Sequence, residues 1–101
     1  MNNTRRKAIK QTIDRFDSIR KKLEELVSEF ESVKSDIEDI QFEEEEYRDN
    51  MPENLQGSER YDKSDNACTN LSDAVDALED MIGALDFDFG DVTTPLEEAM
   101  E

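Results

Sequence analysis

Carboxylates are the side chains of this sequence best suited to chemistry. Glu43 and Glu46, and again Asp73 and Asp76, lie three residues apart, a spacing that brings both side chains to one face of a helix. All-helical nucleotide pyrophosphohydrolases hold Mg²⁺ with acidic residues at this spacing, because Mg²⁺ prefers oxygen ligands. The seven-residue repeat described below places both pairs on faces that point toward water. We therefore predict no magnesium site.

A second acidic segment, DFDFGDVTTPLE, is similar to a calcium-binding loop. Asp86, Asp88 and Glu97 stand at loop positions 1, 3 and 12, which supply ligands in such loops. Gly90 and Asp91, at positions 5 and 6, reverse the usual order of a ligand followed by a sharp turn. We predict no calcium site in this segment.

The composition removes the commonest routes to catalysis. The chain has no histidine, the usual general base at neutral pH and the commonest transition-metal ligand. Its one cysteine, Cys68, has no partner for an internal disulfide. We predict a protein that binds and does not catalyse, with no catalytic residue, no metal and no cofactor.

Charge is abundant and unevenly placed. The net charge is -16, and 40% of the residues are charged. Residues 1–22 hold eight basic and two acidic residues, about +6, whereas the remainder holds four basic and 26 acidic residues, about -22. The strongly acidic remainder of the chain repels phosphate groups, so we do not expect direct binding of nucleic acid. No apolar run is long enough to span a bilayer, so we expect no membrane association and a cytoplasmic location.

Apolar residues recur at alternating spacings of three and four from Ile9 onward, which is the seven-residue repeat of packed helices. With Ile9 at position a, only Thr12 and Glu44 interrupt the two apolar positions. Pro52 disfavours a helical conformation at the residue before it, and Thr4 is a candidate N-cap. We predict a first helix over about residues 4–50. Its apolar positions are Ile9, Phe16, Leu23, Phe30 and Ile37 at a, Ile19, Leu26, Val33, Ile40 and Tyr47 at d, and Ile13 and Val27 at e.

A second repeat follows Gly57 and Ser58 and predicts a helix over about residues 58–86, after a loop at 51–57. In an antiparallel hairpin that turns near Asn54, facing residue numbers sum to about 108. Seven layers are then apolar on both sides. They pair Tyr47 with Tyr61, Ile40 with Cys68, Ile37 with Leu71, Val33 with Val75, Phe30 with Leu78, Leu26 with Ile82, and Leu23 with Leu85.

Two polar features of the hairpin have a structural and a functional interpretation. Glu44 lies opposite Ser64 and is the only charge on the seam; we expect it to set the register, paired with Arg48, Arg60 or Lys63. The tip segment DNMPENLQGSER is polar and flanked by tyrosines, a composition that suits ligand binding. Each tip residue also has a local role in ending one helix or starting the next, so we interpret the segment as a turn.

The C-terminal residues 87–101 form an acidic tail with a predicted short helix. Thr94, Pro95 and Glu97 match an N-cap, a first-turn proline and a capping-box glutamate. If the register continues, Phe89 faces Ile19, Val92 faces Phe16, and three aspartates lie beside the basic residues of the first helix. The aspartates are Asp86, Asp88 and Asp91, and the basic residues are Arg15, Arg20, Lys21 and Lys22.

The second helix is too short to cover the basic end of the first. The tail, a second copy of the chain or another protein must cover its apolar residues. We expect an antiparallel homodimer, because that arrangement places each basic end against the other chain's acidic body. The predicted fold is a single all-α domain, a long coiled-coil-like hairpin with a short C-terminal helix, dimerising into a four-helix bundle. The predicted dimer or partner contacts at the basic end are Ile9, Ile13, Phe16, Arg15 and Arg20.

At EEEEYRDNMPENLQGSERYD, residues 43–62, the chain resembles a type of small acidic protein that recurs in phages and mobile elements of Gram-positive bacteria. The resemblance continues more loosely through LSDAVDALEDMIGAL, and it leaves out the basic start and the DFDFGD segment. It implies an intracellular helical hairpin of phage or bacterial source, in the host cytoplasm if phage-encoded. It supplies no catalytic residue.

The acidic faces carry the functional prediction. Lys and Arg side chains that are placed to meet phosphates also meet carboxylates, so a rigid acidic surface fits a nucleic-acid-binding groove. We expect an accessory protein that binds a basic partner, as a nucleic-acid mimic that inhibits a host defence or DNA-processing enzyme. The alternative is an assembly adaptor whose acidic faces only confer solubility. The candidate partner-binding residues are Glu43, Glu45, Glu46, Asp62, Asp65, Asp73, Asp76, Glu79 and Asp80.

Overall fold

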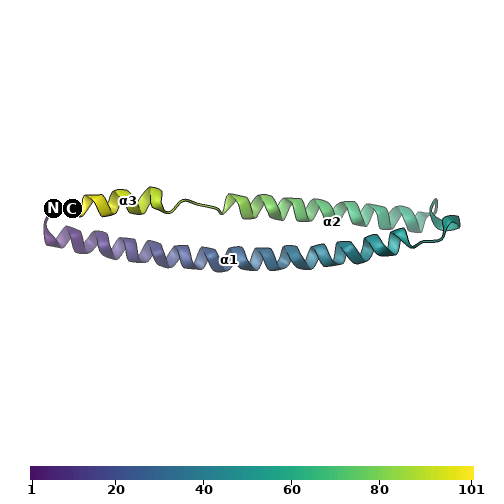
Figure 1. The fold of residues 1–101 in the computed structure, drawn as a ribbon, viewed down its shortest axis with the longest axis horizontal. Helices are drawn as coiled ribbons and strands as arrows, with labels where there is room; N and C mark the ends of the chain where they lie inside the picture. Colours follow the sequence, from purple (N-terminus) through teal and green to yellow (C-terminus); the bar gives the residue numbers. More distant parts are fainter. The chain divides into compact units, whose positions relative to one another are not determined.

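The computed structural model describes all residues, Met1–Glu101, and contains helices and no strands (Figure 1). The elements in chain order are helix α1 (Asn3–Asp49), a short 3-10 helix η1 (Glu53–Leu55), helix α2 (Glu59–Ala84) and helix α3 (Gly90–Ala99). The predicted all-α hairpin with a short C-terminal helix is confirmed.

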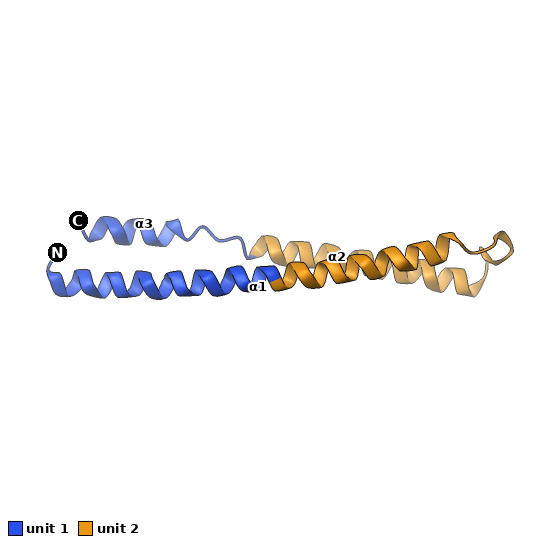
Figure 2. Ribbon diagram, turned by 60° about the horizontal axis from the view of Figure 1, so that its bottom comes forward, with its two compact units in different colours: residues 1–28, 85–101 blue, residues 29–84 orange.

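The chain divides into two compact units, which Figure 2 distinguishes by colour. Unit 1 consists of Met1–Ser28 and Leu85–Glu101, and unit 2 consists of Glu29–Ala84. Helix α1 contributes its first part to unit 1 and its second part to unit 2. None of the helices combines the length and the apolar character needed to cross a membrane.

The turn of unit 2 is built by local interactions. Helix α1 ends at Asp49, three residues before Pro52, whose ψ of 149° is extended. Ser58 precedes α2 and acts as its N-cap: its Oγ accepts a hydrogen bond from the backbone N–H of Tyr61 at 3.3 Å and donates one to the carbonyl oxygen of Leu55. Met51 is buried at the turn, with 7% of its surface exposed. The tip is therefore a turn whose side chains satisfy helix ends.

The core of unit 2 lies between α2 and the second part of α1. Cys68 and Val75, at position a of α2, are only 4% and 8% exposed. On α1, however, the packed positions are a and e, whereas the residues at d remain about half exposed. Two e residues, Lys34 and Arg48, reach across to acidic residues of α2, so the seam of α1 includes position e. The predicted layers that place a d residue of α1 in the core are thus only partly buried.

Unit 1 packs α3 against the first part of α1. The continued register predicts Phe89 opposite Ile19, but the ring of Phe89 packs on Phe16, with 5.0 Å between the ring centroids. The Nε of Arg6 donates a hydrogen bond to the carbonyl oxygen of Met100 at 3.0 Å. A small apolar hollow of about 200 Å³ lies beside this contact. The C-terminal tail therefore covers the basic end of α1 within the same chain. The hollow is lined by Thr12, Arg15, Phe16, Ile19, Val92 and Leu96.

Both predicted N-caps were wrong. Helix α1 begins one residue before Thr4, and the Oδ1 of Asn2 accepts the hydrogen bond from the backbone N–H of Arg5 at 2.8 Å. Helix α3 begins at Gly90, after Phe89, which makes no side-chain cap; the Oδ1 of Asp88 accepts a hydrogen bond from the backbone N–H of Gly90 at 2.9 Å. A carboxylate is a strong acceptor at a helix start, and this earlier start leaves the predicted capping box inside the helix.

The expected pairing of tail aspartates with basic residues of α1 does not form among the ion pairs of unit 1. Arg20 instead contacts Asp17 at 3.8 Å and Glu24 at 3.6 Å, both on its own helix. Neighbours three and four residues away on a helix are always within reach, so they compete effectively with residues of another segment. Unit 1 is held by apolar contacts and one backbone-directed hydrogen bond.

Candidate functional site

The acidic charge is concentrated in unit 2. This unit holds 18 acidic and four basic residues, a net charge of -14, whereas unit 1 holds ten acidic and eight basic residues, a net charge of -2. The tail brings acidic residues to the basic end of α1, so unit 1 is almost neutral. The candidate partner-binding surface therefore belongs to unit 2.

The nine acidic residues predicted to bind a partner fall into two groups. Asp65 forms an ion pair with Arg48 at 3.0 Å, and Glu79 forms an ion pair with Lys34 at 3.0 Å. Glu45 is partly buried and accepts a hydrogen bond from Gln41 at 3.1 Å. Asp65 and Glu79 thus join α2 to α1, whereas the hydrogen bond of Glu45 lies within α1. The other six are exposed and make no ion pair within the unit: Glu43, Glu46, Asp62, Asp73, Asp76 and Asp80.

Three of the four basic residues of unit 2 are already paired. Arg48 binds Asp49 and Asp65, and its side chain is only 22% exposed. Lys34, 26% exposed, binds Glu79, and this hydrogen bond raises the pKa of the ammonium group. Hydrogen bonding to Asp49 likewise raises the pKa of the Arg48 guanidinium, opposed by its desolvation. Lys63 binds Glu59 at 3.2 Å. Only Arg60 is without an ion pair in this unit.

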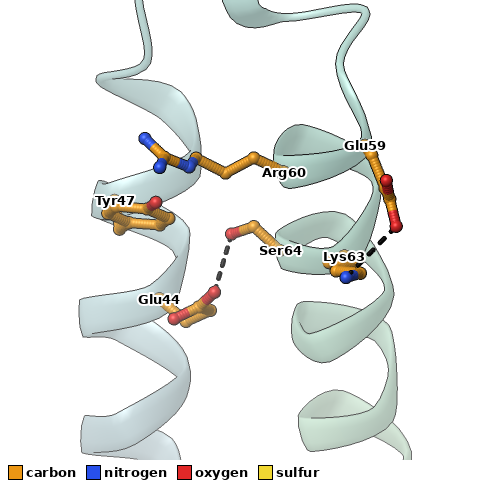
Figure 3. Close-up of a pocket in the computed structure, with 6 residues that line it drawn as sticks. All are labelled: Glu44, Tyr47, Glu59, Arg60, Lys63 and Ser64. Atoms are coloured by element: carbon orange, nitrogen blue, oxygen red, sulfur yellow. Dashed lines mark hydrogen bonds and ion pairs between the residues drawn. The ribbon is translucent and has the colours of Figure 1, made fainter.

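A polar hollow of about 460 Å³ opens between the helices near the turn (Figure 3). Its floor is a hydrogen bond of 2.7 Å in which the Oγ of Ser64 donates to the Oε1 of Glu44. Ser64 is 4% exposed, and its partner is the predicted register residue. The prediction that Glu44 pairs with Arg48, Arg60 or Lys63 was wrong. Glu44 instead accepts its hydrogen bond from Ser64, the small residue directly opposite it. The hollow is lined by Glu44, Tyr47, Glu59, Arg60, Lys63 and Ser64.

The sequence prediction missed this hollow, although the polar Glu44–Ser64 layer was the signal for it. A short serine opposite a carboxylate fills less volume than two apolar side chains, and in Figure 3 Arg60 extends over Tyr47 toward α1. The hollow holds two carboxylates and two cationic side chains, so its charges balance. It offers no single-signed site for a charged small ligand.

No group of three or more His, Cys, Asp or Glu side chains is placed to hold a metal ion. Burial of Cys68 raises the pKa of its thiol, which disfavours the thiolate that acts as a nucleophile. The Glu43–Glu46 and Asp73–Asp76 pairs are exposed on the outside of their helices.

The residues predicted as partner contacts at the basic end lie in unit 1. Ile9, Ile13 and Phe16 are partly buried, and Phe16 packs on Phe89. Arg15 lines the apolar hollow, and Arg20 is paired with its own helix. Most of this predicted surface is engaged within the chain.

Comparison of the chain with known protein families, with curated proteins and with solved structures finds no match to any of them.

Proposed function

We propose that this protein is a non-enzymatic binding protein whose unit 2 occupies the nucleic-acid-binding surface of a basic partner protein. One observation carries the proposal: unit 2 has a net charge of -14, and three of its four basic residues are held in ion pairs. The negative charge is therefore presented outward on a paired-helix scaffold. Binding by complementary charge would be fast and specific for a basic surface.

The density of charge supports a comparison with nucleic acid. Helix α2 has 26 residues and is about 39 Å long, so a net charge of -14 corresponds to one negative charge per about 2.8 Å. Double-stranded DNA carries one per about 1.7 Å. On α2, Asp73, Asp76 and Asp80 recur after three and four residues and so share one exposed face. A row of carboxylates of this kind meets Lys and Arg side chains placed for phosphates.

The setting of this proposal follows from the resemblance to phage and mobile-element proteins. In that setting, occupation of a nucleic-acid-binding groove inhibits a host defence or DNA-processing enzyme. The protein acts by exclusion, and it requires no reactive group, metal or cofactor.

The experiment is affinity capture from the host cell with the native chain and two variants that each lose four negative charges. Both variants alter exposed residues, so both keep the fold. We expect the unit 2 variant to retain less than one tenth of the captured basic protein and the unit 1 variant to retain most of it. The unit 2 variant is Glu46→Gln, Asp73→Asn, Asp76→Asn and Asp80→Asn; the unit 1 variant is Asp91→Asn, Glu97→Gln, Glu98→Gln and Glu101→Gln.

Competition identifies mimicry. Double-stranded DNA added to the captured complex should release the partner, and the purified chain should displace DNA from it. Equal capture by the native chain and the unit 2 variant would contradict the proposal. If salt released the partner but DNA did not, binding would be driven by charge, and the proposal of nucleic-acid mimicry would be rejected.

A specific observation favours a second function, that of an assembly adaptor. The d residues of α1 stay about half exposed, and such residues suit association with other helices. Light scattering separates the two functions, because an adaptor that builds a scaffold forms large or filamentous assemblies. A closed small assembly favours the binding protein.

A further inference from the structure

The largest series of solvent-exposed apolar side chains lies at position d of the seven-residue repeat of α1. In unit 1, Ile19 is 54% and Leu26 is 49% exposed; in unit 2, Val33 is 49%, Ile40 is 53% and Tyr47 is 48% exposed. These five residues are called the outer stripe below. Single exposed apolar residues are ordinary on protein surfaces, but five at one repeat position of one helix form an interaction surface.

The width of the apolar face of α1 explains why this stripe is left over. Apolar residues occupy positions a, d and e, and a face of this width is typical of a helix with two neighbours. The chain supplies only one neighbour in each unit, α3 in unit 1 and α2 in unit 2, and that neighbour covers positions a and e. Position d is available for a second neighbour.

We propose that the outer stripe packs against the outer stripe of a second copy of this chain, with the two α1 helices antiparallel. In the symmetric register, facing d residues have numbers that sum to 59. Ile19 then meets Ile40 of the second copy, Leu26 meets its Val33, and Thr12 meets its Tyr47. Each layer joins unit 1 of one copy to unit 2 of the other, and all but the outermost are apolar on both sides.

The charges beside the stripe select this orientation. Position g flanks position d, and in an antiparallel pair g residues face each other across the seam. With this register their numbers sum to 58, so Arg15 faces Glu43 of the second copy and Lys22 faces its Asp36. All four side chains are exposed, and none takes part in an ion pair within the chain. A parallel pair would instead place the acidic unit 2 of one copy against that of the other.

One residue lies on the symmetry axis of the proposed dimer. Glu29, also at position g and exposed, would face Glu29 of the second copy. Like charges at such a position weaken association modestly. Glu29→Gln should therefore lower the dimer dissociation constant about two- to fivefold, an effect opposite in sign to those of the variants below.

The first test is sedimentation equilibrium of the full chain. We expect a dimer, and we expect Leu26→Asp with Ile40→Asp to raise its dissociation constant about a hundredfold or more, because each change occurs twice in the dimer. Phe42→Asp is the matched control, since Phe42 is 60% exposed but lies at position f. The control should leave the dimer unchanged. A monomeric native chain, a larger assembly, or equal effects of stripe and control variants would overturn the proposal.

The second test fixes the orientation by disulfide formation in a Cys68→Ser background. Chains with Lys22→Cys are mixed with chains with Asp36→Cys and oxidised. The antiparallel dimer should give mainly the mixed disulfide, because position 22 of one copy faces position 36 of the other. Preferential disulfides between identical chains would show a parallel pair and overturn the proposal. Circular dichroism confirms that every variant keeps its helices.

Discussion

The two units of this chain are held together in different ways. Unit 2 pairs α2 with α1 through buried Cys68 and Val75 and through ion pairs that reach from one helix to the other, and it carries a net charge of -14. Unit 1 holds α3 on α1 through the Phe16–Phe89 contact and a backbone hydrogen bond, and it is nearly neutral. Cross-helix ion pairs and an acidic surface thus occur in the same unit.

This difference teaches how the chain carries so much charge. Acidic residues that repel one another destabilise a compact state. In unit 2 some of them, such as Asp65 and Glu79, are used to fasten the helices, and the rest face solvent. In unit 1 the basic residues of α1 offset the acidic tail through their overall charge, without defined pairs between the segments.

The largest expected effect breaks the core of unit 2. Val75→Asp places a charge without a partner in a site that is 8% exposed, which should lower the free energy of unfolding by about 3 kcal/mol or more. Met81→Asp on the same helix, at a residue 54% exposed, is the control and should change it by less than about 0.5 kcal/mol. Urea unfolding followed by circular dichroism measures both. Equal effects would show that α2 does not pack as described.

The polar layer of unit 2 should matter next. Ser64→Ala removes the only donor to Glu44 Oε1 and should cost about 1.5 kcal/mol, because a hydrogen bond to a charged acceptor is stronger than a neutral one. Glu44→Ala, made alone and together with Ser64→Ala, completes a double-mutant cycle. Strict additivity in that cycle would mean that the two side chains do not interact.

Loss of the aromatic contact should loosen unit 1 alone. Phe89→Ala should destabilise the docking of α3 by about 1 kcal/mol through loss of its packing on Phe16. Hydrogen exchange should accelerate at the amides of residues 90–99 and stay unchanged at those of α2. Phe87→Ala should have a smaller effect, since Phe87 is 59% exposed and loses only its edge-on contact with Phe89, at 6.4 Å between ring centroids. Faster exchange throughout α2 would show that the two units open together.

The smallest expected effect is that of alkaline pH, which should lower the free energy of unfolding through two groups of unit 2. Lys34 has a raised pKa because of its hydrogen bond to Glu79, so its contribution is present below about pH 10.5 and is lost as the pH rises through the folded value. Cys68 has a pKa raised by burial, and its contribution has the same sign, present below its ordinary pKa of 9.0 and lost above. Unfolding at pH about 8 and about 11 should therefore show a smaller decline in a Lys34→Met, Cys68→Ala variant than in the native chain. An equal decline would contradict these assignments.

The sequence predicted the elements because their signals are local. The seven-residue repeat, Pro52 and the Gly57–Ser58 pair predicted the ends of α1 and α2 to within a few residues. The start of α3 was mispredicted, because the helix begins at Gly90 without a side-chain cap, where Asp88 accepts the backbone N–H of Gly90, and the Thr94 motif lies inside the helix. Propensity alone does not decide between such neighbouring starts.

The candidate surface was predicted by composition and only partly by residue. Exposure of Glu43, Glu46, Asp73 and Asp76 follows from their positions in the repeat. That Asp65 and Glu79 serve the hairpin instead depends on how far the seam of α1 turns toward position e. The wide apolar face allows several rotations of that seam, so periodicity did not specify the one adopted.

Cys68 has a consequence for kinetics. It is the chain's one thiol, and with 4% of its surface exposed it is shielded between the helices of unit 2. A thiol reagent larger than water reaches its Sγ only when the two helices separate, so the rate of labelling equals the rate of opening when the reagent modifies the open form faster than the helices close again. The labelling rate of Cys68 in the native chain therefore reports how often the α1–α2 hairpin opens. The labelling of Cys68 would become slower if binding of the proposed partner stabilised the closed hairpin.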